Sequence, residues 1–224
     1  MFKVLKYGNI GWHINNESIY REFEDAEETE SWGKEVYGEW AQNYKRVMRT
    51  AQNAIKGSLA SSSIECYCGY MYRQINEYLR NEIDDKHNTY RELADIMALV
   101  LCSAPRIPCD LVVYRLVPDK FIEELVRNNK KTPQYPTQEK GFMSTSMLKS
   151  IVEEKEEPYA KYSNLLKIYV DKNSIGIYVN VIANRSEEEL LLFSNGYLAL
   201  TKYPYVDVDS GKTVFECKLI NFYC

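Results

Sequence analysis

Three short stretches in the second half of the chain carry polar side chains in positions suited to chemistry. The first is Arg115, which lies inside the apolar run Leu111–Leu116, where a charge is costly unless an anion accompanies it. A guanidinium binds a phosphate through two parallel hydrogen bonds, so a bound pyrophosphate would explain Arg115. An arginine on a strand face that pairs with a carboxylate is the alternative, and this residue alone does not decide between them.

The second stretch is a row of hydroxyl side chains, Ser144, Thr145 and Ser146, which follows Gly141-Phe142. Three hydroxyls on a strand are most often ordinary solvent-facing or cross-strand residues. In a functional site they would instead hydrogen-bond a carboxylate and keep it aimed at a ligand. The hydroxyls therefore indicate a functional site only if a carboxylate lies near them.

The third stretch supplies carboxylates, because Glu187, Glu188 and Glu189 directly precede three leucines. An acidic triplet is usually a solvated turn, but this one adjoins an apolar run that predicts a buried strand. Side-chain alternation puts Glu187 and Glu189 on one side and Glu188 on the other, although three glutamates in a row allow the register to slip by one. Two carboxylates near a phosphate-binding arginine would suit glycosidic chemistry, in which they stabilise a positively charged sugar centre.

The elements that must position these residues change in kind along the chain. Up to about residue 108 the apolar residues recur with helical spacing, most clearly over residues 67–79 and 93–101. Thr89 and Glu92 offer a capping box before the second of these stripes. This part of the chain is therefore predicted to be helical.

From about residue 109 to residue 224 the apolar runs are short and rich in residues that favour strands. The predicted strands are Leu111–Leu116, Phe142–Ser146, Leu165–Val170, Ile175–Ile182, Leu190–Phe193, Tyr197–Leu200 and Val214–Phe222. Asp119 is predicted to cap a short helix after the first of them. Helices followed by strands, with no repeat or flexible linker, indicate a single α+β domain that spans residues 1–224.

The composition excludes several classes of protein. With 45% hydrophobic and 27% charged residues the chain is an ordinary globular mixture, and its formal charge of −4 argues against a nucleic-acid partner. The sequence contains no run of about 18 apolar residues, which a membrane-spanning helix would need. Two histidines and six cysteines without a paired C-x-x-C set predict no metal site, and they favour reduced thiols over a Cys–His nucleophile pair.

The amino-terminal segment lacks the apolar region of a secretory signal. The chain is therefore a mature form, is exported by another route, or stays inside the cell.

In order and rough spacing the three stretches resemble the Arg–Ser–Glu class of ADP-ribosyltransferases. The likeness extends over most of the chain to the enzymatic components of binary toxins of the iota-toxin and vegetative-insecticidal kind. The strings that carry it are Ser31-Trp-Gly, Glu39-Trp-Ala, Tyr72-x-x-Ile75-Asn-x-Tyr78-Leu-Arg80, Val113-Tyr-Arg, Lys140-Gly-Phe-Met-Ser-Thr-Ser and Glu187-x-Glu189-Leu-Leu-Leu. Each string is weak alone, and six in the right order make the resemblance strong.

The resemblance implies a fold and a role for each site residue. The fold is an ADP-ribosyltransferase domain with amino-terminal helices packed on a two-sheet, mainly antiparallel β core. Arg115 would contact the NAD phosphates, Ser144 would position the catalytic Glu189 at the ribose next to nicotinamide, and Glu187 would assist the acceptor. Four further positions would complete the NAD site: Thr145 and Ser146 would shape the pocket, and Tyr67 and Tyr72 would flank NAD.

Lys167 would hold the NAD phosphates together with Arg115, since it stands where relatives carry a second phosphate-binding arginine. Leu116 stands where some relatives carry another arginine beside the strand arginine. A lysine keeps the charge but loses the paired hydrogen bonds of a guanidinium. We therefore expect these two departures to leave the phosphates with fewer contacts than in the relatives.

The implied activity is transfer of ADP-ribose from NAD, as substrate, to a protein arginine, with no metal. Glu187 favours arginine because a guanidinium of pKa above 12 needs a nearby carboxylate. Actin is the target by family analogy alone, and we expect a monomeric toxin or effector that is secreted or delivered into a target cell. Two other classes stay open: an enzyme that mainly hydrolyses NAD, and a non-enzymatic interaction module on the same fold.

Overall fold

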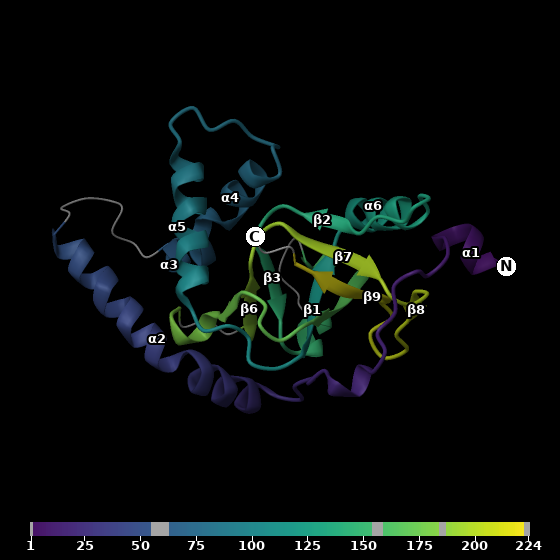
Figure 1. The fold of residues 1–224 in the computed structure, drawn as a ribbon, viewed down its shortest axis with the longest axis horizontal. Helices are drawn as coiled ribbons and strands as arrows, with labels where there is room; N and C mark the ends of the chain where they lie inside the picture. The colour runs from purple at the N-terminus through teal and green to yellow at the C-terminus, as the bar shows by residue number, and fades with distance from the viewer. Residues whose placement is uncertain (1, 55–62, 154–158, 184–186, 222–224) are drawn as a thin grey trace.

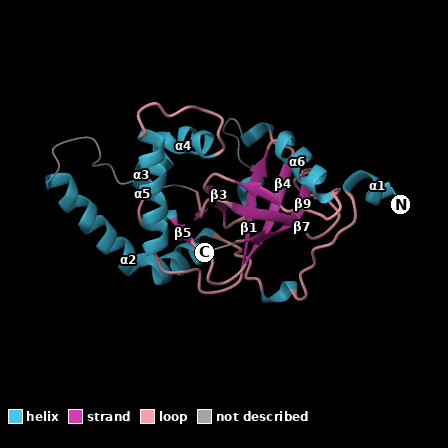
Figure 2. Cartoon of the chain, turned by 45° about the horizontal axis from the view of Figure 1, so that its top comes forward, coloured by secondary structure: helices cyan, strands magenta, loops and turns pink. Residues whose placement is uncertain are grey.

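The computed structural model describes residues 2–54, 63–153, 159–183 and 187–221. The helices are α1 (Phe2–Tyr7), α2 (Ala26–Ala54), α3 (Ser63–Cys66), α4 (Tyr72–Leu79), α5 (Thr89–Ser103) and α6 (Asp119–Asn129), and the π-helical turn Tyr67–Met71 joins α3 to α4. Figures 1 and 2 show α2 to α5 on one side of the strands and α1 and α6 at the other end.

The strands form one connected sheet that is mostly antiparallel. They are β1 (Leu111–Val117), β2 (Thr137–Glu139), β3 (Met143–Ser146), β4 (Asn164–Val170), β5 (Gly176–Tyr178), β6 (Glu189–Leu192), β7 (Gly196–Leu200), β8 (Tyr205–Val206) and β9 (Thr213–Ile220). Their order is β2-β7-β9-β4-β1-β3-β6-β5, with β8 paired to β9, and the pair β4–β9 is parallel. Apolar clusters cover both faces of β1, with Val113 and Val117 in the larger one and Val112 and Leu116 in the smaller.

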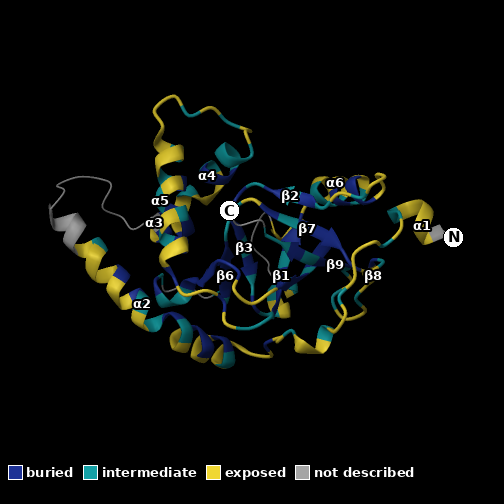
Figure 3. Cartoon of the chain, in the orientation of Figure 1, coloured by how far each residue is buried: buried dark blue, intermediate teal, exposed yellow. Residues whose placement is uncertain are grey.

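The long helix α2 lies along the outside of the molecule and buries one stripe. Thr29, Trp32, Gly33 and Tyr37 are buried at helical spacing, while the acidic residues of its first turns face solvent. Figure 3 shows this division, with exposed residues along the outer face of α2 and mostly buried strands behind it. A Cβ on Gly33 would lie 2.0 Å from the ring of Tyr178, so only glycine lets the helix approach β5 this closely.

The predicted fold class is confirmed: amino-terminal helices pack on a mainly antiparallel β core in an α+β arrangement. Where two sheets were expected, the hydrogen-bonded path from β2 to β5 is continuous. The run Ile175–Ile182 contains only the short strand β5, because a 3-10 turn begins at Val179. Strands β2 and β8 were not predicted, since β2 has three polar residues and β8 has only two residues, both exposed. The last predicted strand ends at Ile220, with Phe222 outside the described residues.

Both predicted helix caps are wrong in detail. Thr89 is already the first helical residue of α5, and Asp85 caps the helix by accepting hydrogen bonds from the amides of Thr89 and Arg91, each at 2.9 Å. Asp119 begins α6 but accepts its hydrogen bond from the Asn164 side chain at 2.6 Å. At α5 the carboxylate of Asp85, in place of Thr89, accepts hydrogen bonds from amides of the first turn. At α6 the side-chain amide of Asn164 binds the Asp119 carboxylate that was expected to cap the helix.

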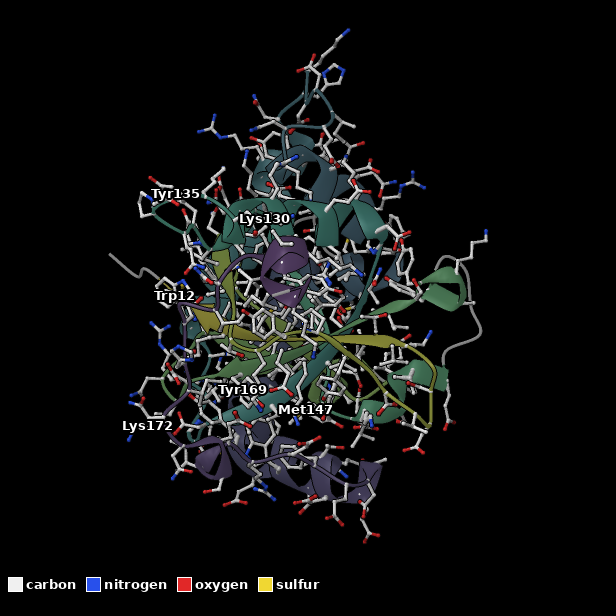
Figure 4. The ribbon with its side chains drawn as sticks, turned by 90° about the vertical axis from the view of Figure 1, so that its right-hand side faces the viewer. Trp12, Lys130, Tyr135, Met147, Tyr169 and Lys172 are labelled. Carbon is white, nitrogen blue, oxygen red and sulfur yellow. The ribbon has the colours of Figure 1, made fainter. Side chains whose placement is uncertain are left out.

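A single amide side chain fastens the amino-terminal segment to α6. Asn129 donates hydrogen bonds to the carbonyls of Tyr7, at 2.8 Å, and Asn9, at 2.9 Å. Figure 4 looks onto this end of the molecule, with Trp12 and Tyr135 at its outer edge and Tyr169 in its interior. Of the helices that the structure describes, none is long and apolar enough to cross a membrane.

Candidate active site

The three chemical stretches come together because their strands are neighbours in the sheet. Arg115 is on β1, Ser144 on β3 and Glu189 on β6, and the sheet places these strands side by side in the order β1-β3-β6. Ser146 is the register partner of both Tyr114 on β1 and Glu189 on β6. Residues that are 74 positions apart in sequence are thereby brought to one region.

Ser144 and Glu189 make direct contact. Ser144 pairs with Leu191, so its side chain lies diagonally across from Glu189 on the same face of β3 and β6. The Ser144 hydroxyl donates a hydrogen bond to Oε1 of Glu189, whose side chain is almost fully buried at 5% exposure. The hydroxyl therefore fixes the direction of a carboxylate that has little solvent around it.

The acidic triplet divides as side-chain alternation predicts. Glu187 and Glu189 line one cavity, whereas Glu188 points the other way, toward α2. Oε2 of Glu188 accepts hydrogen bonds from Thr29 Oγ1, at 2.9 Å, and from the hydroxyl of Tyr178. Glu188 thus links the turn before β6 to two buried residues and holds its two neighbours toward the cavity.

The cavity has a volume of about 950 Å³ and reaches all of the stretches with candidate chemistry. Arg115, Ser144 and Glu189 line it together with Tyr67 and Tyr72. Ligand sites of roughly 300–1,000 Å³ are common in proteins, so the space suits a molecule as large as a dinucleotide.

The two tyrosines reach the same cavity because the helix that carries them contains a π-helical turn. In a regular α-helix residues five apart point about 140° away from each other. Here the amide of Tyr72 bonds to the carbonyl of Tyr67 in an i to i+5 step, which adds a residue to the turn. Their rings meet edge to face with centroids 6.5 Å apart, Tyr67 buried and Tyr72 39% exposed.

Asn76 is a site residue to which the sequence analysis gave no role. Its side-chain amide donates to the Tyr67 hydroxyl at 2.9 Å, and its Oδ1 accepts the amide of Phe142 at 2.9 Å. A Cβ on Gly141 would lie 2.7 Å from Asn76 Oδ1, so glycine is required beside it. Asn76 therefore ties α4 to the segment that leads into β3, and an asparagine within an apolar helical stripe was the available signal.

Arg115 contacts a carboxylate that was also not anticipated. Its Nη2 lies 3.7 Å from Oε2 of the buried Glu139, while its Nη1 is buried without a hydrogen-bond partner among the described residues. Glu139 accepts two hydrogen bonds from Arg80, whose Nε and Nη2 each lie 3.0 Å from one carboxylate oxygen, and a third from the amide of Gly141 at 2.9 Å. The carboxylate of Glu139 is thus a structural partner for Nη2 of Arg115 and leaves its Nη1 without a hydrogen-bond partner among the described residues.

The predicted role of Lys167 is corrected. In the register of β1 and β4, Lys167 is opposite Tyr114 and Arg115 is opposite Leu166, so the two cations lie on different faces of the sheet. Lys167 forms an ion pair with Glu22 at 2.9 Å and does not line the cavity. The prediction was wrong because the face on which Lys167 lies relative to Arg115 depends on how β4 pairs with β1. The sequence shows the alternation along each strand but not this pairing.

Thr145 and Ser146 lie at the cavity but use their hydroxyls within the fold. Thr145 donates to the carbonyl of Leu190 at 2.7 Å, and Ser146 donates to the carbonyl of Leu148 at 2.9 Å. They fix β3 against β6 and against the turn that follows, and so they shape the pocket through its walls.

Charges in the site perturb the neighbouring side chains. Burial raises the pKa of Tyr67, and the negative charge of Glu189 raises it further, against the opposing hydrogen bond from Asn76 and the charge of Arg115. Burial would also raise the pKa of Glu139, but the charge of Arg115 and the hydrogen bond and charge of Arg80 outweigh it, so that pKa is lowered. Glu139 is therefore a carboxylate held in its charged form by two guanidiniums.

These features can be compared with known protein families. The family model described as "ADP-ribosyltransferase exoenzyme" matches residues 29–213. The chain belongs to this family. Within it, NAD is the substrate that supplies ADP-ribose. An arginine whose buried Nη1 has no hydrogen-bond partner in the described part of the chain fits the anionic phosphates of that substrate. No metal-binding group of three or more side chains occurs among the described residues.

Solved structures of ADP-ribosylating toxins share the fold. BECa, from a binary enterotoxin of C. perfringens and determined with NADH, matches with a TM-score of 0.65 and 21% identity over 90% of this chain and 50% of its own. Plx2a from Paenibacillus larvae matches with a TM-score of 0.62 and 18% identity over 87% and 96%. The Clostridium limosum C3 exoenzyme matches with a TM-score of 0.59 and 16% identity over 90% and 98%.

This exoenzyme chain therefore spans about half the length of BECa and nearly all of Plx2a and C3. No curated protein matches it.

Proposed function

We propose that this chain transfers ADP-ribose from NAD to an arginine side chain of a target protein and releases nicotinamide. The observation that carries the proposal is the arrangement of Glu189 and Glu187: both line the cavity, and Ser144 holds the first of them by a hydrogen bond. Family membership supports the NAD-dependent reaction, and the second carboxylate supports arginine as the acceptor.

Bond cleavage requires stabilisation of a developing positive charge. When the bond between nicotinamide and ribose breaks, its electron pair leaves with nicotinamide, which departs as a neutral molecule and needs no strong acid. The ribose becomes oxocarbenium-like, and the buried carboxylate of Glu189 is the group suited to stabilise it. Arg115 would hold the phosphates, and Tyr67 and Tyr72 would flank the dinucleotide.

Transfer to arginine requires a second carboxylate. A guanidinium is protonated at neutral pH, so the acceptor nitrogen needs a neighbouring group that attracts it and takes its proton as the new bond to ribose forms. Glu187 is half-buried at the same cavity and two residues from Glu189, which suits it to this role. Water is small and uncharged, so hydrolysis of NAD would not depend on Glu187.

The target and delivery follow by analogy. Likeness to the enzymatic components of binary toxins makes actin the first target to test, and likeness to C3 exoenzymes calls for a second trial with other host proteins. We also propose that the chain acts as a secreted toxin or effector that enters a target cell, as a monomer that needs no metal.

The experiment compares three substitutions in the acidic triplet. Nicotinamide release is measured by HPLC, and protein labelling is measured with biotinylated NAD in a cell extract. Glu189→Gln should lower both activities by about 10²–10³, the scale of one electrostatic contact to a transition state. Glu187→Gln should abolish labelling but retain most nicotinamide release.

Glu188→Gln is the matched control, because its side chain faces α2 and glutamine still accepts hydrogen bonds from Thr29 and Tyr178. It should keep both activities. Wild-type nicotinamide release by the Glu189 variant would exclude the proposed chemistry. Equal loss of both activities in the Glu187 variant would place Glu187 in NAD cleavage, and nicotinamide release without any protein labelling by the wild type would indicate an NAD glycohydrolase.

A further inference from the structure

Basic side chains gather at the end of the molecule that is formed by α1 and the last turn of α6. We call this surface the basic end, and it is built from residues 3–12 and 127–135. Its cations are all exposed: Lys3, Lys6, Arg127, Lys130 and Lys131. The segments 2–16 and 125–138 contain no aspartate or glutamate, although the whole chain has 32 acidic and 28 basic side chains. Positive charge is therefore concentrated here against the acidic balance of the chain.

The two segments of the basic end are held together by backbone and amide contacts. Asn129 donates hydrogen bonds to the carbonyls of Tyr7 and Asn9, and the side-chain amide of Gln134 also donates to the carbonyl of Asn9. Gly8 has a φ of +81°, and a Cβ on it would lie 2.9 Å from the carbonyl oxygen of Asn129. A left-handed backbone and this close approach both require glycine. The basic end is therefore a defined part of the folded surface.

Exposed apolar side chains lie among these cations. Leu5 is 71% exposed, Tyr135 is 55% exposed and Trp12 is 37% exposed. Figure 4 faces this end and shows Trp12 and Tyr135 at its outer edge, with Lys130 beside α1. Nζ of Lys131 lies 5.7 Å from the centre of the Tyr135 ring. Tryptophan and tyrosine combine an apolar ring with a polar group, which suits the boundary between water and an apolar phase.

We propose that the basic end binds an anionic phospholipid surface. Its cations would lie at the headgroup phosphates and carboxylates, and Leu5, Trp12 and Tyr135 would enter the headgroup region. The inference does not depend on the proposed chemistry, because the cavity is lined by other described residues. On α6, the residues at the cavity are Lys120, Phe121 and Glu124, which precede the turn that belongs to the basic end.

The contacts of the cations favour lipid over a partner with fixed carboxylates. Among the described residues, no carboxylate forms an ion pair with the lysines of the basic end, and Arg127 makes only a 3.9 Å contact with Glu124. Exposed lysines on flexible stems suit the many mobile charges of a membrane, where each basic residue near the surface strengthens binding several-fold. An acidic protein would gain more from cations that the fold holds in place. A second copy of the basic end would be repelled.

The test measures sedimentation of the full chain with phosphatidylcholine vesicles that contain or lack phosphatidylserine. The wild type should bind only the vesicles with phosphatidylserine. Binding should fall as salt rises from about 0.1 M to about 1 M, because the screening length falls from about 10 Å to about 3 Å. The double variant Lys130→Glu with Lys131→Glu should weaken binding about 10-fold or more, because it reverses two charges at the lipid surface.

A matched control makes the same change of charge elsewhere. Lys34→Glu with Lys45→Glu alters two exposed lysines of α2, which lies on the other side of the strands from α1 (Figure 2). This variant should bind vesicles as the wild type does. Both double variants should keep the wild-type melting temperature and nicotinamide release, because neither touches the cavity or the buried core.

Tryptophan fluorescence tests the apolar part of the contact. Of the three tryptophans in the chain, Trp12 is exposed and Trp32 is buried. Binding to phosphatidylserine vesicles should shift the emission to shorter wavelength, as the Trp12 ring leaves water. Trp12→Phe should still bind through the lysines but should lose this shift.

Four results would overturn the inference. Equal binding to both kinds of vesicle would exclude recognition of anionic lipid, and wild-type binding by the Lys130 and Lys131 variant would exclude the basic end. Equal loss of binding in the α2 control would make overall charge the cause. Binding to soluble poly-glutamate without binding to vesicles would identify an acidic protein as the partner instead.

Discussion

The contact between Glu188, Thr29 and Tyr178 predicts a specific loss of stability that can be measured directly. Glu188→Ala removes the acceptor of two side-chain hydroxyls. Thr29 keeps an acceptor, because its hydroxyl also bonds to the carbonyl of Ala26 at 2.9 Å. Tyr178 is fully buried, and the other side chain bonded to its hydroxyl is Asn180, which donates rather than accepts. The substitution therefore leaves one buried donor without a partner.

The magnitude follows from that single donor. A buried polar group left unsatisfied costs about 1–3 kcal/mol, and in domains of this size each kcal/mol corresponds to about 2–4 °C in the melting temperature. We therefore expect Glu188→Ala to lower the melting temperature by about 2–12 °C. Glu188→Gln should lower it much less, because the amide oxygen still accepts the Tyr178 proton.

A double-mutant cycle with Tyr178→Phe tests whether the lost hydrogen bond between Tyr178 and Glu188 causes the loss of stability. Phenylalanine fills the same space and has no hydroxyl, so the pair Glu188→Ala with Tyr178→Phe contains no unsatisfied donor. The double variant should be at least as stable as Glu188→Ala alone, which corresponds to a coupling energy of about 1–2 kcal/mol. Urea denaturation of the four proteins measures it. Strictly additive effects would show that the two side chains do not interact and would refute this account of the acidic triplet.

Two further predictions concern the cations and carboxylates of the cavity. Arg115→Lys should raise the KM for NAD more than it lowers kcat, because lysine keeps a charge but loses the paired hydrogen bonds; steady-state kinetics check this, and an unchanged KM would make Arg115 only a partner of Glu139. Because the pKa of Glu139 is lowered from its ordinary value of 4.5, its contribution to stability is complete above that pH and is lost as the pH falls through the folded-state value. Urea titrations between pH 6 and pH 3 should therefore show a smaller loss for Glu139→Gln than for the wild type, and parallel curves would contradict the assignment.

The sequence predicted the elements that carry the chemistry because those elements are strongly patterned. The apolar run around Arg115 became β1, and the alternation through Glu187 to Glu189 placed the outer two glutamates at one cavity. Both predictions depend on near neighbours in the chain, where the pleat of a strand fixes which side chains share a face.

The remaining contacts could not be predicted, because they depend on which elements become neighbours. Glu139 lies in a polar three-residue strand with no apolar pattern, and its partner Arg80 is 59 residues away, directly after α4. Lys167 was misplaced for the same reason, since its face depends on the pairing of β1 with β4. Local sequence patterns predict the secondary structure of a segment, but not which other segments it packs against.

The π-helical turn Tyr67–Met71 makes the lining of the cavity sensitive to the backbone geometry of one helix. A π-turn amounts to one residue inserted into an α-helix, and here Gly69 adds length without a side chain that contacts anything, since a Cβ on it would meet no atom within 4 Å. If the same residues adopted regular α-helical geometry, the extra residue would take up a further 100° of helix, and everything after the turn would rotate by about that angle relative to Tyr67. Tyr72 and Asn76 would both turn away from the cavity although neither had been substituted. At this point the backbone geometry decides which side chains face the cavity, which a comparison of residue types alone would overlook.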